Sequence, residues 1–198
     1  MSTPRHATVH RRTGETEITV ALTLDGTGES TVETGIGFLD HMIGALARHA
    51  RWSLTLRCAG DLHVDDHHTA EDTALALGAA FAEAVGPRVG IARFGHAYAP
   101  LDEALARAVV DLSGRPWPAV ELGLRRPTLG AIATENLTHW VQSFAIAAKA
   151  NVHLQVLAGQ NDHHRAEAAF KALALALRAA AARDAAAGVP STKGTLDA

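Results

Sequence analysis

The 198-residue sequence contains a single cysteine, Cys58, so it cannot form an internal disulfide or supply a cysteine-rich zinc site. Aromatic residues make up only 5% of the chain, and the net charge is −3. Both values argue against a base-stacking platform and against electrostatic attraction to nucleic acid or an anionic membrane. We therefore expect no nucleic acid and no membrane among the partners of this protein.

Long hydrophobic runs are also missing. The most apolar stretch, residues 166–188, is interrupted by charged side chains, which excludes a membrane-spanning helix there. Residues 1–17 are polar and lack the apolar segment of a signal peptide, so we expect a soluble cytoplasmic protein. Apolar residues make up 47% of the chain and charged residues 20%, as in ordinary globular domains. Histidine, with 12 residues, is the unusual component.

Two kinds of hydrophobic periodicity run along the chain. Alternation of apolar and polar residues predicts strands at 17–25, 30–34, 52–58, 97–111, 119–124 and 152–157. Helical spacing and flanking Gly or Pro predict helices at 38–50, 67–85, 134–150 and 163–187. We expect the strand at 30–34 to pair with the strand at 17–25.

The predicted elements occur twice in the same order, and residue identities repeat with them. Residues 39–41 read Leu-Asp-His and residues 137–139 read Leu-Thr-His, while 66–71 and 162–167 both read Asp-His-His-x-Ala-Glu. Such a repeat predicts a duplicated domain, with halves at 1–92 and 93–198 forming one compact unit. A duplicated core has a packing reason to keep its apolar periodicity but none to keep His-His-x-x-Glu, so the repeat indicates chemistry.

The repeated motif has the spacing of metal ligands on a helix. Residues four apart lie on one face, so His67 and Glu71 can point at one ion. His68 is turned away by about 100°, which suggests two ions, one on each side of the helix. The candidate ligands are His41, His67, His68, Glu71, His139, His163, His164 and Glu167. Shared between two ions, they give each three imidazoles and one carboxylate, with positions left open for catalysis.

Aspartates beside the motifs are candidates to orient the ring nitrogens of these histidines. They are Asp65, Asp66, Asp72 and Asp162. A single His-His pair is typical of a solvated helix face, but recurrence with a glutamate and a third histidine favours metal binding. The ligand set by itself is compatible with a lyase, with a metal-storage protein, and with a metallohydrolase that uses a metal-activated hydroxide.

Three segments of the chain resemble the signature segments of the imidazoleglycerol-phosphate dehydratase family. They are residues 37–42 (Gly-Phe-Leu-Asp-His-Met), 65–72 (Asp-Asp-His-His-Thr-Ala-Glu-Asp) and 161–167 (Asn-Asp-His-His-Arg-Ala-Glu). The resemblance extends from about residue 11 to residue 195. It implies a monofunctional hydro-lyase of histidine biosynthesis that converts imidazole glycerol phosphate to imidazole acetol phosphate and water. It also implies two Mn²⁺ ions per site.

The resemblance carries expectations for the fold and the assembly as well. The fold would be α/β (α+β), with internally duplicated two-layer sheet-and-helix halves of the ribosomal S5 domain 2-like type. The assembly would be a homo-oligomer of 24 subunits with active sites shared between subunits.

The resemblance further implies roles for individual residues. Glu71 and Glu167 would be catalytic through the metal centre, and Glu15 would lie beside the substrate as a general base. Cations and a hydroxyl donor for the substrate phosphate would come from Arg93, Arg115, Ser191 and Lys193. Ser191 and Lys193 belong to a polar tail that we expect to order over bound substrate. Phosphate-binding cations distinguish the lyase from a storage protein, which does not require them.

Overall fold

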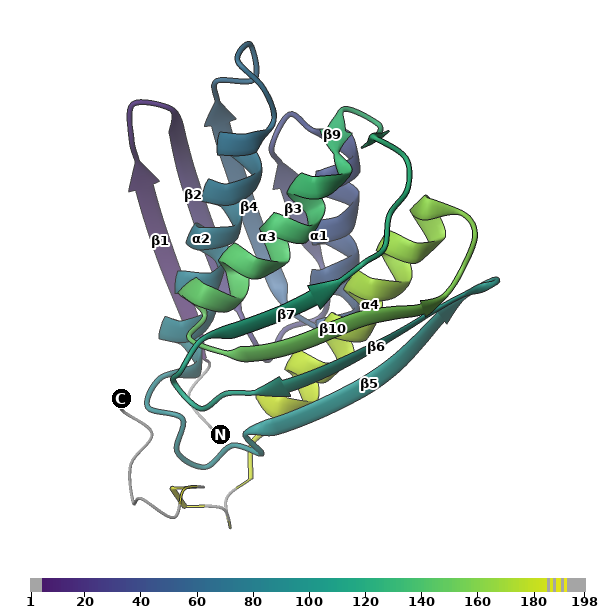
Figure 1. The fold of residues 1–198 in the computed structure, drawn as a ribbon. Helices are drawn as coiled ribbons and strands as arrows, with labels where there is room; N and C mark the ends of the chain where they lie inside the picture. Colours follow the sequence, from purple (N-terminus) through teal and green to yellow (C-terminus); the bar gives the residue numbers. More distant parts are fainter. Residues whose placement is uncertain (1–4, 185, 187, 190, 192–198) are drawn as a thin grey trace.

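Two four-stranded sheets enclose four helices in the computed structural model, which describes residues 5–184, 186, 188, 189 and 191 (Figure 1). The first half comprises β1 (His6–Arg12), β2 (Thr16–Thr23), β3 (Ser30–Glu33), α1 (Gly37–Ala50), β4 (Ser53–Gly60) and α2 (His67–Val85). The second half comprises β5 (Phe94–Leu101), β6 (Ala104–Asp111), β7 (Trp117–Glu121), β8 (Thr128–Leu129), β9 (Ile132–Ala133), α3 (Thr134–Ala147), β10 (Asn151–Ala158) and α4 (Asp162–Ala180).

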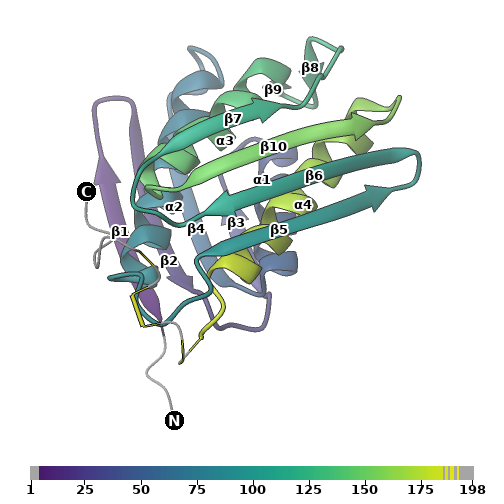
Figure 2. The same cartoon turned by 60° about the horizontal axis from the view of Figure 1, so that its bottom comes forward.

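The two halves have the same topology. The strand orders are β1-β2-β4-β3 and β5-β6-β10-β7, and in each sheet only the last pair is parallel. Figure 2 shows the second sheet with its four strands side by side. The predicted mixed α/β fold of two similar sheet-and-helix halves is therefore confirmed. The last element of the first half, α2, ends at Val85, and the first strand of the second half, β5, begins at Phe94. The division of the chain between residues 92 and 93 stays a prediction.

Two predictions about strands were wrong, and one long strand was missed. β3 pairs in parallel with β4, not with β2, because α1 connects β3 to β4 and a strand that returns through a crossover helix lies parallel to the first. The segment 97–111 is a hairpin, β5–β6, which turns at Asp102 with a left-handed φ of 46°. β1 was not predicted because it is an edge strand with only Ala7 fully buried, so its sequence reads as polar.

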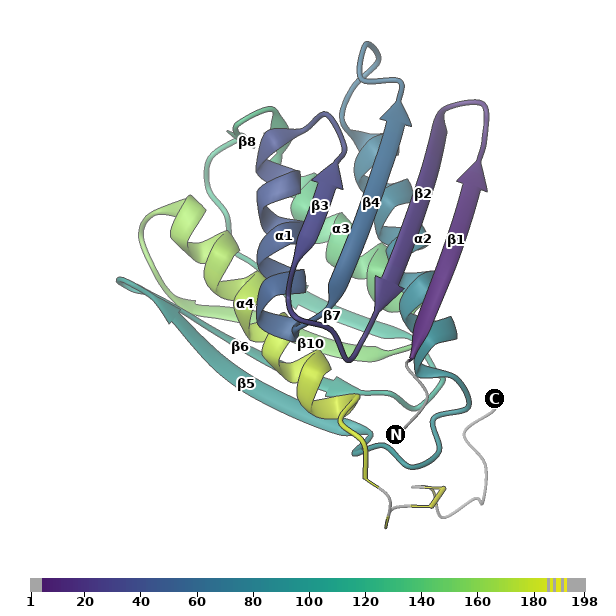
Figure 3. The same cartoon turned by 180° about the vertical axis from the view of Figure 1, so that it is seen from behind.

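Helices α1 and α2 pack on the first sheet, α3 and α4 pack on the second, and the two helix layers pack on each other (Figures 1 and 3). An aromatic cluster fills the space between the layers, with the rings of Trp140 and Phe144 stacked at 5.6 Å. The Trp140 indole N–H donates to Thr73 across the α2–α3 contact, at 3.3 Å. Buried aromatics of this size dominate core energetics, so this packing sets how the helices cross.

Each helix carries its motif histidine in its first two turns. The helices α1, α2 and α3 begin at the upper end of the molecule in Figure 1, and α4 begins near them. The packing of the helix layers thereby brings motif residues from distant parts of the chain together. Among the described residues, none of the helices combines the length and apolar character needed to span a bilayer.

Candidate metal centre

Among the residues that the structure describes, two groups of side chains have ligand atoms close enough to share an ion. In what we call the α1–α4 cluster, His41, His163 and Glu167 place one ligand atom each within 4.8 Å of one another. The α2–α3 cluster brings together His67, Glu71 and His139 in the same way. Each cluster therefore offers two imidazole nitrogens and one carboxylate oxygen.

The α1–α4 cluster is organised around Glu167. The Nε2 atoms of His41 and His163 lie 3.1 Å and 3.2 Å from the same oxygen, Glu167 Oε2. The other oxygen, Oε1, pairs with Lys171 Nζ at 2.7 Å. Burial by itself raises the pKa of Glu167, but its bonds to Lys171 and His41 outweigh burial and lower the pKa to about 2. The carboxylate is therefore ionised at neutral pH, as a metal ligand must be.

The α2–α3 cluster has the same donors in a different setting. His139 Nε2 lies 3.0 Å from Glu71 Oε1, and the rings of His67 and His139 stack at 5.0 Å. His67 Nδ1 lies 3.1 Å from Asn136 Oδ1, so the ring N–H donates to the amide oxygen and Nε2 keeps its lone pair for an ion. His67 and Glu71 share one face of α2, as their spacing predicted, and this face meets His139 of α3.

Each cluster combines one histidine from one half of the chain with a His–Glu pair from the other. His41 of the first half joins His163 and Glu167 of the second, and His139 of the second half joins His67 and Glu71 of the first. This exchange follows from the fold, because α1 packs against α4 and α2 packs against α3. Neither half alone contains a complete cluster.

The remaining two motif histidines, His68 and His164, face away from both clusters. His68 lies between two carboxylates, with Nδ1 3.0 Å from Asp61 and Nε2 3.5 Å from Glu15. The hydrogen bond to Asp61 and the charge of Glu15 raise the pKa of His68. Each cluster of this chain thus has two imidazoles instead of the three expected, because adjacent helix residues point about 100° apart.

His164 has equivalent surroundings in the second half. Its Nδ1 lies 2.7 Å from Glu103 and its Nε2 3.8 Å from Asp102, both in the β5–β6 turn. The hydrogen bond to Glu103 raises the pKa of His164. Glu103 also accepts the backbone N–H groups of Asn161 and Gln160 ahead of α4, and these bonds, with that to His164, lower the pKa of Glu103 to about 2.

The prediction that four aspartates orient the histidine rings was wrong. Each of the four binds another group. Asp65 accepts a hydrogen bond from the backbone N–H of His67, and Asp66 accepts one from the backbone N–H of Ala133. Asp72 binds the side chains of Arg11 and Thr16, and Asp162 accepts the backbone N–H groups of Arg125 and Arg126. Asp65, Asp66 and Asp162 hold backbone around the helix starts, and Asp72 binds side chains of β1 and β2. The rings are instead oriented by Asp61, Glu103 and Asn136, which sequence reasoning missed because they meet the histidines only through tertiary packing. Lys171 was also missed, although its position four residues after Glu167 was a detectable signal.

Two of the predicted phosphate-binding residues, Arg93 and Arg115, lie at the other end of the molecule from the clusters. The backbone N–H of Arg93 donates to Ala180 O at the end of α4, while its guanidinium binds Asp111 through two hydrogen bonds of 2.7 Å and 3.1 Å. Arg115 is exposed in the connection between β6 and β7. This connection starts beside Arg93, because the backbone N–H of Leu112 donates to Arg93 O at 3.0 Å. Ser191 is among the described residues, whereas Lys193 lies outside them.

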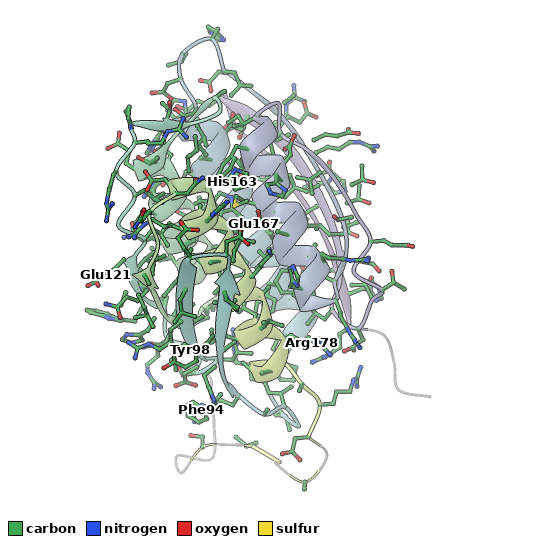
Figure 4. All side chains as sticks on the ribbon, turned by 90° about the vertical axis from the view of Figure 1, so that its right-hand side faces the viewer. Phe94, Tyr98, Glu121, His163, Glu167 and Arg178 are labelled. Atoms are coloured by element: carbon green, nitrogen blue, oxygen red, sulfur yellow. The ribbon has the colours of Figure 1, made fainter. Side chains whose placement is uncertain are left out.

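The distance between Arg93 and the clusters follows from the length of α4. His163 stands at its first turn and Ala180 at its last residue, which corresponds to about 25 Å at ~1.5 Å per residue. Figure 4 shows His163 and Glu167 well above Phe94, the residue that follows Arg93. Arg93 and a small substrate held at the clusters of the same chain are therefore too far apart to touch.

Comparisons with known proteins point to a single family. The family model of imidazoleglycerol-phosphate dehydratase matches residues 34–177. The dehydratases of Neurospora crassa and Schizosaccharomyces pombe are 55% and 52% identical to this chain, over 98% and 97% of it and 96% and 100% of their own lengths. A dehydratase of Phytophthora nicotianae is 59% identical over 97% of this chain, which spans 42% of that longer protein.

Solved structures with this fold carry the same name. The Staphylococcus aureus imidazoleglycerol-phosphate dehydratase superposes with a TM-score of 0.81 at 32% identity, covering 90% of this chain and 99% of that one. The Pyrococcus furiosus enzyme, in complex with the compound (S)-C348, superposes with a TM-score of 0.80 at 34% identity, covering 94% and 99%. The chain therefore belongs to the imidazoleglycerol-phosphate dehydratase family, whose members are hydro-lyases of histidine biosynthesis.

Proposed function

We propose that the α1–α4 and α2–α3 clusters hold two Mn²⁺ ions per active site, at which imidazole glycerol phosphate loses water to give imidazole acetol phosphate. The hydro-lyase class follows from family membership, whereas the metal, its number and the residue roles are the proposal. The observation that carries it is the repetition of one donor set, two imidazoles and a carboxylate, in two pseudo-equivalent clusters. We further propose that the enzyme works in the cytoplasm.

The donor set fits the proposed ion. Imidazole nitrogen and carboxylate oxygen are ligands that Mn²⁺ accepts, and three such ligands leave octahedral positions open for substrate. Glu167 is ionised, and the hydrogen bond at His67 Nδ1 leaves Nε2 available. When bound, the ions supply a Lewis acid that draws electron density from the substrate's imidazole ring.

We propose that the active site is shared between subunits of a homo-oligomer, with 24 subunits as the family resemblance implies. The separation of about 25 Å between the clusters and Arg93 exceeds the reach of a three-carbon phosphate ester. Arg93, Arg115, Ser191 and Lys193 would therefore bind the phosphate of a substrate held at a neighbouring subunit's clusters. His68 and His164, which face away from their own clusters, would supply the third imidazole of each ion in the same way.

The proposed general base is Glu15, at the tip of the β1–β2 turn. Its carboxylate is held 3.5 Å from His68 Nε2, next to Asp61 on the other side of the ring. If His68 binds an ion of a neighbouring subunit, Glu15 is carried to that site with it. There the carboxylate would accept the proton that leaves the substrate side chain as the hydroxyl departs.

The test is turnover of imidazole glycerol phosphate by chelator-stripped protein, before and after Mn²⁺ is restored. We expect activity to disappear with the metal, which elemental analysis verifies, and to return as about two Mn²⁺ ions bind per subunit. Full turnover by metal-free protein would contradict the metal role. Mn²⁺ binding without turnover would contradict the assigned reaction while leaving the clusters as a metal site.

A further inference from the structure

We infer that the two clusters differ in metal affinity: the α2–α3 cluster binds the first divalent ion tightly, and the α1–α4 cluster binds the second at least tenfold more weakly. This inference rests on the proposed function, in which both clusters hold ions. It comes from comparing pseudo-equivalent positions around two clusters that have the same ligands. Two such positions differ, and both differences act in the same direction.

The first difference is a lysine. Glu167 is followed four residues later by Lys171, whose Nζ lies 2.7 Å from Oε1, whereas the position four residues after Glu71 is Leu75. Both side chains of the Glu167–Lys171 pair are largely buried, with 15% and 19% exposed, so solvent screens the ammonium poorly. An ion bound at Oε2 would stand roughly 5 Å from this ammonium. Even in bulk water, the repulsion at that distance lowers the affinity for a divalent cation by about tenfold.

The lysine also restricts how Glu167 can bind. One carboxylate oxygen is held by Lys171 and the other faces His41 and His163, so only Oε2 is directed at an ion. Glu71 has no such cation among the described contacts and can direct either oxygen to its ion. The α1–α4 cluster therefore offers the same ligand types with less net negative charge.

The second difference lies beside the rings. Asn136 accepts the hydrogen bond of His67 Nδ1 in the α2–α3 cluster, and such a partner fixes the ring and typically strengthens metal binding by about 10–100-fold. By the alignment of the two halves, the pseudo-equivalent residue in the α1–α4 cluster is Phe38. Its ring packs edge-on against His163 at 5.1 Å and has no acceptor to offer. His163 therefore lacks the support that His67 receives from this position.

The experiment is a titration of chelator-stripped protein with Mn²⁺ alone, followed by calorimetry and by the electron paramagnetic resonance signal of free Mn²⁺. For the wild type we expect one tight and one weak ion per subunit, with affinities at least tenfold apart. Glu71→Gln should remove the tight class and Glu167→Gln the weak class, which assigns each class to its cluster.

A reciprocal pair of substitutions tests the cause. Lys171→Leu should strengthen the weak class about tenfold, and Leu75→Lys should weaken the tight class by a similar factor. If Lys171→Leu does not fold, Lys171→Gln removes the charge while keeping a polar chain. Equal affinities in the wild type, or a weak class unchanged by either Lys171 variant, would overturn the inference. Absence of any Mn²⁺ binding by the wild type would instead refute the proposed function.

Discussion

Gly78 in α2 lies where α2 packs tightly against α3, the other helix of its cluster. A Cβ added there would stand 2.6 Å from Phe144 O, 2.8 Å from Ala147 Cβ and 3.0 Å from Ala148 N. Two of these atoms belong to the backbone of the neighbouring helix and its C-terminal end, so no side-chain rotation can relieve the contact. We predict that Gly78→Ala forces α2 and α3 apart and destabilises the protein.

The magnitude follows from two opposing effects. Alanine is favoured over glycine inside a helix by about 0.8–1 kcal/mol. Overpacking a well-packed interface costs about 1–3 kcal/mol, and contacts with backbone put this position at the upper end. The net loss is about 1–2 kcal/mol, or roughly 3–6 °C in Tm for a chain of this length. Because His67 and His139 stack at 5.0 Å across the same interface, Mn²⁺ affinity at the α2–α3 cluster should fall as well.

Gly44 in α1 is the matched control. A Cβ there would meet only Ser30 Oγ at 3.8 Å, so Gly44→Ala should stabilise the protein by about 0.5–1 kcal/mol through helix propensity alone. Thermal melts of chelator-treated protein at one fixed concentration give the comparison, because metal and assembly also shift Tm. If Gly78→Ala melts at or above the wild-type temperature, the close approach of α2 and α3 does not constrain the site.

Three further predictions concern the site directly. Glu71→Gln and Glu167→Gln should each remove an ion and lower turnover by more than about 100-fold, because losing a metal ligand costs more activity than losing a residue that supports one. The control for metal content and rate is Glu83→Gln, at an exposed position of α2. Deletion of 189–198 should raise KM about tenfold or more, because charge-assisted bonds to phosphate are lost, and an unchanged KM would refute the role of the tail. Glu103 has its pKa lowered from 4.5 to about 2 by backbone N–H groups and a histidine, so its stabilisation is present above pH 4.5 and is lost as the pH falls towards 2. The Tm difference between wild type and Glu103→Gln should shrink over that interval, and a constant difference would count against the assignment.

Much of the fold followed from local pattern. The helix at 67–85 was predicted with its observed bounds, because its apolar periodicity ends cleanly at Gly86. Strand β1 was not predicted, since an edge strand that buries little apolar surface has no strong alternation to detect. The pairing of β3 with β4 was also missed, because register between strands depends on the path of the intervening helix.

The ligand types were determined by the sequence itself. So were the different directions in which His67 and His68 point, because side-chain direction on a helix depends only on spacing. Only the tertiary structure decided that His139 joins His67 and that His41 joins His163, since each contact crosses between halves that are far apart in the chain. It also decided that Asp61 and Glu103 hold the outward-facing rings, in place of the aspartates beside the motifs. Spacing along one helix carries no information about which other helix packs against it. Helix packing is set by the complementarity of whole core faces, which the spacing of the ligand residues does not encode.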